Sequence, residues 1–146
     1  MTARRLGPAE PYADPAVMRA LLLDARVWAV VGLGDNPARP AWGVARWLQG
    51  RGKEVVPVHP RAEVVHGQQG YPTLGEVPVP VDVVDLFVRS DRVGAIVDQA
   101  IECGARAVWM QLGVVDEAAA ARAKAAGLAV VMDRCPAIEG PRLLPG

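Results

Sequence analysis

The sequence predicts an α/β fold: a doubly wound, Rossmann-like sheet of five parallel strands in a single domain. Short, almost wholly apolar runs alternate with amphipathic helical patterns, which is typical of a parallel sheet covered by helices on both faces. The first apolar run ends at Gly32-Leu33-Gly34 and leads into a helix, as in mononucleotide-binding units. A chain of 146 residues has room for one such core.

The first half of the chain is expected to contain two helices and two strands. Residues 1–13 show no periodic pattern and are expected to be irregular. Asp14 and Pro15 then supply an N-cap and a first-turn proline, and apolar residues recur at helical spacing after them. The expected elements are a helix over 14–25, a strand over 27–32, a helix over 40–51 and a strand over 54–58.

The second half continues the alternation after a loop. Residues 63–80 are rich in Gly and Pro and are expected to be irregular, with a short extended piece near Tyr71. Ser90 and Asp116 stand where each can cap a helix. The expected elements are a strand over 83–88, a helix from Ser90 to Gly104, a strand over 107–110, a helix over 116–126 closed by Gly127, and a strand over 128–132.

The amino-acid composition limits which binding partners and which cellular location we expect. The formal net charge is zero and no basic stripe is present, so nucleic acid is not an expected partner. No secretory leader or membrane-length apolar run is visible, and we expect a cytoplasmic protein that does not bind membranes, with Cys103 and Cys135 reduced. Cys103 is expected in the core. A homodimer is plausible on general frequency, with any exposed tryptophan as the place to look: Trp28, Trp42, Trp47 and Trp109.

The turn after the first strand is the candidate phosphate site. A helix N-terminus presents unpaired N–H groups and a positive dipole end to an anion. Pro37 stands where a dinucleotide fingerprint has its third glycine, so a plain strand-to-helix turn is the alternative. Asn36 and Arg39 could add side-chain contacts, and Arg39 could equally be a solvated surface residue. The residues of this candidate site are Gly32, Leu33, Gly34, Asp35, Asn36 and Arg39.

The second strand ends in a base where an NAD-binding unit would end in an acid. Val58 is followed by His59, Pro60 and Arg61. An acid there would hydrogen-bond a free ribose diol, whereas a guanidinium suits a ribose that carries phosphate. These residues therefore favour a phosphorylated adenosine, and the alternative is a loop arginine without a partner. No cysteine or acid stands at ligand spacing from the histidines, and no metal site is expected.

Further candidates follow the third and fourth strands. Phe87 could border an adenine, although a core position is the simpler interpretation, and Arg89 could contact a phosphate. Gln111 could hydrogen-bond the amides of an extended ligand arm or cap local backbone. Gly113 could permit close approach of that arm, or could serve only an unusual backbone angle.

The sequence contains few residues of the types that usually act in catalysis, and no catalytic residue is predicted. Ser90 is the only serine and the chain has two histidines. Cys135 follows the last strand beside Asp133 and Arg134, where a guanidinium could make a thiol reactive. A thiol enzyme or redox sensor that uses Cys135 is therefore one alternative function, and a small buried cysteine is the simpler interpretation.

Four segments of the chain occur in a recognisable order: Val31–Pro37 with Arg39-Pro40, Pro57–Arg61, Ile101–Val114 and Ala126–Pro136. Together they resemble the CoA-binding-domain family of small bacterial proteins, whose fold is similar to the N-terminal nucleotide domain of the succinyl-CoA synthetase alpha subunit. The resemblance covers nearly all of the chain from Val27 to Glu139. His59 and Arg61 stand where we associate asparagine and lysine with the second motif, and the arginine keeps the charge.

The resemblance implies coenzyme A as the ligand, bound at the carboxyl ends of the strands. It implies that the pyrophosphate lies near Gly32–Asn36 and that Arg61 faces the 3′-phosphate, which leaves the pantetheine arm directed toward Gln111 and Gly113. Thioester ligation is not implied, because the synthetase's phosphorylated histidine lies in another domain. We expect a protein that binds CoA or an acyl-CoA without catalysis of its own. An NADP-dependent reductase module is the other alternative, since it shares the phosphate chemistry.

Overall fold

The computed structural model describes residues 10–145, which form one α/β, Rossmann-like domain. Its sheet has five strands, all parallel, in the order β2-β1-β3-β4-β5. The predicted fold class and all five predicted strands are confirmed. The strands are β1 (Val27–Val31), β2 (Glu54–Val58), β3 (Val83–Leu86), β4 (Ala107–Met110) and β5 (Ala129–Val131).

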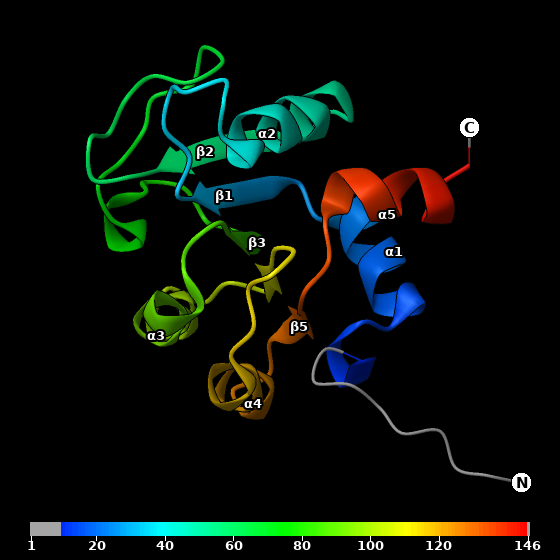
Figure 1. Ribbon diagram of the computed structural model, residues 1–146. Coiled ribbons are helices and arrows are strands. Elements are labelled where there is room, and N and C mark those ends of the chain that lie inside the picture. The colour runs from blue at the N-terminus through cyan, green and yellow to red at the C-terminus, as the bar shows by residue number, and fades with distance from the viewer. Residues whose placement is uncertain (1–9, 146) are drawn as a thin grey trace, which may run out of the picture.

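Helices cover both faces of the sheet. In Figure 1, α3 and α4 lie on one side, while α1, α2 and α5 lie on the other. Each face has its own apolar core: Val84 and Leu86 of β3 belong to one cluster, and Trp28 and Val30 of β1 to the second. The helices are α1 (Pro15–Asp24), α2 (Pro40–Gly50), α3 (Val93–Glu102), α4 (Glu117–Ala125) and α5 (Pro136–Leu143), with short 3-10 helices η1 (Glu10–Tyr12), η2 (Leu74–Glu76) and η3 (Ser90–Arg92).

The strand register brings the carboxyl ends of the strands to one edge. Val31 pairs with both Val58 and Leu86, and Leu86 pairs with Met110. The chain reverses its direction of winding between β1 and β3, and ligands of doubly wound folds bind above such a switch point. The loops after β1, β2, β3 and β4 therefore meet at this edge.

Most helix ends follow the expected chemistry. The Asp14 carboxylate accepts a hydrogen bond from the Ala16 N–H, and the Asp116 carboxylate accepts one from the Ala119 N–H. Gly104 and Gly127 follow α3 and α4 with φ of +75° and +93°, which glycine adopts without a steric penalty.

Three details of the secondary structure differ from the sequence-based expectations. Helix α5 was not among the expected elements, which ended with the strand over 128–132. Glu10–Tyr12 form η1 within the stretch expected to be irregular, while residues 1–9 of that stretch lie outside the described residues. β3 ends at Leu86 rather than at residue 88. The extended piece near Tyr71 is present as a single bridge between Tyr71 and Val58.

The four tryptophans differ in exposure. Trp28 and Trp109 are fully buried and lie against each other, with ring centroids 5.7 Å apart. Trp42 and Trp47 on α2 are half-buried.

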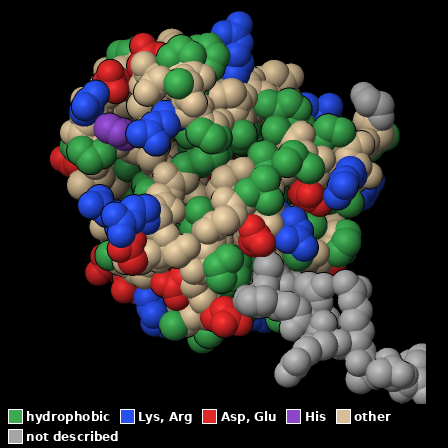
Figure 2. All heavy atoms as spheres, in the orientation of Figure 1, with side chains coloured by type: hydrophobic (Ala, Val, Ile, Leu, Met, Phe, Trp, Pro, Cys, Tyr) green, Lys and Arg blue, Asp and Glu red, His purple; other side chains and the backbone are tan. Residues whose placement is uncertain are grey.

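Figure 2 shows Lys and Arg side chains gathered with a histidine over the β1–α2 turn and the segment after β2.

Candidate functional site

The turn after β1 is braced by the loops on either side of it. The Gly32 N–H donates to the Val58 carbonyl at 2.8 Å, which ties the turn to the end of β2. Gly32 has a φ of +96°, and a Cβ atom on it would overlap the carbonyl oxygen of Phe87 at the end of β3. Only glycine fits this position, because both the backbone angle and the space exclude a side chain.

The turn holds backbone donors that face no acceptor. The Asn36 side chain accepts from the Ala38 N–H at 3.0 Å, so Asn36 folds the turn locally. The N–H groups of Leu33 and Gly34 have no acceptor among residues 10–145. Because α2 begins at Pro40, a few residues on, the positive end of its dipole adds to these amides. The unpaired donors of this turn are therefore backbone groups.

Trp42 and His66 hold the first turn of α2, and the sequence reasoning missed both. The Trp42 indole N–H donates to the Asp35 carboxylate at 3.2 Å, and the His66 ring lies edge-on to the indole at 4.4 Å between centroids. His66 Nε2 also hydrogen-bonds the Trp42 carbonyl at 2.7 Å. These contacts fasten the segment after β2 onto α2, beside the turn.

The end of β2 brings His59 to the turn. Its ring lies 3.6 Å from the Cβ position of Gly34, and its Nδ1 accepts from the Arg61 N–H at 3.1 Å. Val58 is buried in the sheet, while Pro60 is exposed. The Arg61 side chain is exposed, and no carboxylate of residues 10–145 lies within 4.0 Å of its guanidinium.

Two residues after β3 have partners within the protein. Phe87 is half-buried against the core on the side of α1, α2 and α5, in agreement with the simpler interpretation. The Arg89 guanidinium pairs with Asp91 at 2.9 Å, and both side chains are mostly exposed. Arg39 also lies at the surface, at the N-cap of α2, without a side-chain cap.

Hydrogen bonds join the loops after β3, β4 and β5. The Gly113 N–H donates to the Asp133 carboxylate at 2.7 Å, and the Ser90 hydroxyl donates to the Gly113 carbonyl at 3.4 Å while accepting from Val115 N–H. Ser90 therefore does not cap α3, which corrects the sequence-based expectation: its hydroxyl is used between loops. Gly113 has a φ of +78°, so its left-handed conformation is required by the loop itself.

Gln111 contributes a buried acceptor without a partner. The residue follows β4 at this edge and is 6% exposed, and its side-chain Oε1 accepts no hydrogen bond from residues 10–145. Buried acceptors are normally satisfied, and leaving one unpaired costs free energy. This atom is thus a buried acceptor that the described chain leaves unsatisfied.

Asp85 is a second buried polar residue, and the sequence reasoning missed it. The residue is fully buried in β3, opposite Val30 and Trp109, and neither carboxylate oxygen has a partner in the described chain. Burial alone raises the pKa of the Asp85 carboxyl well above its usual range. The signal was present in the sequence as one acid inside the apolar run 83–88.

The two cysteines occupy different environments, and both are free. Cys135 is buried at the N-cap of α5, where the Arg134 guanidinium donates to the Asp133 carbonyl. Cys103 is exposed, contrary to the expected core position, because it caps α3 at the surface. Within residues 10–145, no group of three His, Cys, Asp or Glu residues is arranged to hold a metal ion.

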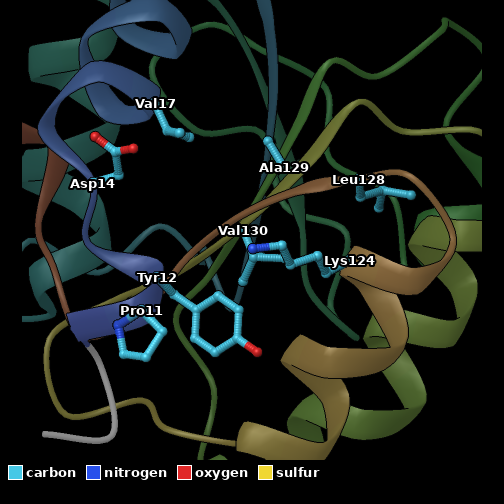
Figure 3. Close-up of a pocket in the computed structure, with 8 residues that line it drawn as sticks. All are labelled: Pro11, Tyr12, Asp14, Val17, Lys124, Leu128, Ala129 and Val130. Carbon is cyan, nitrogen blue, oxygen red and sulfur yellow. The ribbon is translucent and has the colours of Figure 1, made fainter. Parts of the chain in front are cut away.

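A small cavity of about 140 Å³ lies away from this edge, between the start of α1, the end of α4 and β5. Figure 3 shows the Lys124 side chain extending from α4 toward Tyr12, and the ammonium group lies 5.9 Å from the centre of the phenol ring. A second, open hollow is lined by Arg46, Gln49, Gly50 and His66. Neither contains a predicted site residue.

In the described part of the chain, no helix has the length and apolarity to cross a membrane.

The parallel sheet, the glycine turn at the switch point and the unpaired polar groups around it define a Rossmann-like α/β domain with a candidate site at the carboxyl edge of its sheet. Residues 26–141 match the CoA binding domain family, and the chain belongs to that family. The resemblance inferred from the four sequence segments is thereby confirmed.

Related proteins share this domain over most of its length. The chain is 33% identical to YneT of Bacillus subtilis (strain 168) over 120 residues, which are 82% of this chain and 89% of that protein. A hypothetical protein from Pyrococcus horikoshii OT3 is 34% identical, with a TM-score of 0.89 over 98% of this chain and all of that one. An acetyl-coenzyme A synthetase of Ca. Korarchaeum cryptofilum is 25% identical with a TM-score of 0.68, over 78% of this chain and 27% of the synthetase.

Proposed function

We propose that this domain binds coenzyme A or an acyl-CoA at the carboxyl edge of its sheet and carries out no reaction of its own. The pyrophosphate lies at the turn 32–36, the ribose 3′-phosphate at Arg61, and the pantetheine arm runs toward Gln111 and Gly113. Membership of the CoA binding domain family supports the ligand class.

The observation that carries the proposal is the match between unpaired groups and ligand chemistry. The free N–H groups of Leu33 and Gly34 are donors, as phosphate oxygens require. The free Oε1 of Gln111 is a buried acceptor, as the amide N–H groups of pantetheine require. Donors at the β1 turn and an acceptor beyond β4 suit a ligand that is anionic at one end and amide-bearing at the other.

Arg61 supplies the specificity for a phosphorylated ribose. Its guanidinium follows β2, is exposed and forms no ion pair among residues 10–145, so it can engage a phosphate without breaking a contact. A charge-assisted hydrogen bond of this kind contributes about 1.5–3 kcal/mol, or roughly tenfold to hundredfold in affinity.

Calorimetric titration with CoA and with 3′-dephospho-CoA tests the proposal. The parent protein is expected to prefer CoA, and Arg61→Ala should lose affinity for CoA by roughly tenfold to hundredfold while binding dephospho-CoA almost unchanged. Arg51→Ala is the matched control, because Arg51 lies at the C-terminal end of α2, away from the turn after β1. This variant should keep the parent's preference for CoA over dephospho-CoA. Equal affinity of the parent for the two ligands contradicts the role of Arg61. Saturable binding of NADP without binding of CoA would instead favour a reductase module.

A further inference from the structure

Glu63 places a carboxylate on the turn proposed for the pyrophosphate. Its Oε1 accepts a hydrogen bond from the Asp35 N–H at 3.3 Å. The same oxygen lies 3.1 Å from the Cβ position of Gly34, so the carboxylate covers the middle of the turn. A carboxylate of the protein therefore accepts the hydrogen bond of one backbone amide in the turn where an anionic ligand would bind.

The segment after β2 is folded so that it presents this carboxylate. Ala62 is left-handed with a φ of +48°, and its N–H donates to the His59 carbonyl at 2.8 Å. Gly70 packs so closely on the Glu63 backbone that a Cβ atom there would overlap the Glu63 carbonyl oxygen. Glu63 itself is half-buried. Its position is thus set by backbone contacts on both sides, not by the hydrogen bond to Asp35 alone.

A pyrophosphate and the Glu63 carboxylate compete for the same place. Both are anions, and the Asp35 N–H, an amide of the same turn, can donate to either of them. Like charges at contact distance repel each other, most strongly where water is partly excluded. No Lys or Arg side chain of residues 10–145 lies within 4.0 Å of the Glu63 carboxylate to offset this repulsion.

From this geometry, and resting on the proposed CoA site, we infer that the Glu63 carboxylate competes with the ligand. In the free protein it accepts the hydrogen bond of the Asp35 N–H. Binding of CoA requires this carboxylate to move away, and the free energy of that movement lowers the affinity for CoA. Removing the charge should therefore strengthen binding of CoA. The opposite result is expected if Glu63 contacts the bound ligand, for example a hydroxyl group.

Calorimetric titration of CoA into Glu63→Gln and Glu63→Ala tests the inference. Each variant should bind CoA about threefold to tenfold more tightly than the parent, a gain that matches the net contribution of one typical hydrogen bond. Glu102→Gln is the matched control, because it removes the same charge at an exposed position at the end of α3, and it should stay within about twofold of the parent.

Unchanged or weaker binding in both Glu63 variants overturns the inference while leaving the CoA site intact. Absence of CoA binding in the parent and in both Glu63 variants overturns the proposed function, and the inference with it. Amide hydrogen exchange checks the contact without ligand: the Asp35 N–H should exchange faster in Glu63→Ala than in the parent and in Glu102→Gln. An unchanged rate in Glu63→Ala contradicts the contact itself.

Discussion

Gly32 and the carbonyl oxygen of Phe87 are packed so closely that no side chain fits between them. The contact joins the loops after β1 and β3, the two strands between which the winding of the chain reverses. The glycine of the turn is therefore needed by the protein framework as well as by any ligand.

Gly32→Ala should destabilise the fold strongly. The left-handed backbone costs an alanine about 1–2 kcal/mol, and overlap with the Phe87 carbonyl raises the loss of unfolding free energy to about 2–4 kcal/mol. Gly127→Ala is the control, because Gly127 has nearly the same φ, +93°, with no atom within 4 Å of its Cβ position. Urea denaturation measures both variants. Equal losses would show that the contact with Phe87 is not tight.

Gly140 of α5 packs on the indole ring of Trp47 in α2, and a Cβ atom on Gly140 would overlap that ring. Gly140→Ala should therefore force α2 and α5 apart and cost about 1–3 kcal/mol of unfolding free energy. The loss is measured by thermal or chemical denaturation.

Gly43→Ala provides the comparison for Gly140→Ala. Gly43 lies within α2, and its Cβ position has open space around it, so alanine should stabilise the protein by about 0.5–1 kcal/mol through helix propensity. If both alanine variants were stabilised to the same extent, the packing of α5 against Trp47 would be refuted.

Asp85→Asn should change how stability depends on pH. Burial raises the pKa of Asp85 in the folded protein above its usual value of 3.8. Between the unfolded and the folded pKa the folded state holds one more proton than the unfolded state, so stability falls as pH rises through that interval. The slope approaches about 1.4 kcal/mol per pH unit, and asparagine removes it.

Unfolding free energies measured from pH 4 to pH 8 test this prediction. The gain of Asp85→Asn over the parent should be small near pH 4 and should grow with pH. Asp98→Asn, which removes an exposed partner of Arg122, should run parallel to the parent within about 0.5 kcal/mol. A constant difference between Asp85→Asn and the parent would mean that the carboxyl titrates normally.

The sequence predicted the sheet well, because its strands are buried on both faces and so carry an apolar pattern that does not depend on their neighbours. Helix α5 did not follow such a rule. Its sequence contains Gly140 and Pro141, and the helix forms because α2 and α1 supply surfaces that it covers. Packing between distant segments overrode the local preference.

Only those parts of the candidate site that directly follow a strand in the sequence could be predicted. The glycine turn and the His59 segment follow directly from the strands before them, and the structure brings His59 against Gly34. The positions of Glu63 and Ser90 depend on how separate loops fold onto each other. Their contacts could not be inferred from spacing along the chain.

A two-dimensional ¹H–¹⁵N spectrum recorded during titration with CoA tests the central claim most directly, because it reports where the ligand lies. The account predicts that the largest shifts fall on the amides of residues 32–36, 59–61 and 111–113. Shifts confined to the cavity beside Tyr12 and Lys124, or a spectrum unchanged by excess CoA, would contradict it.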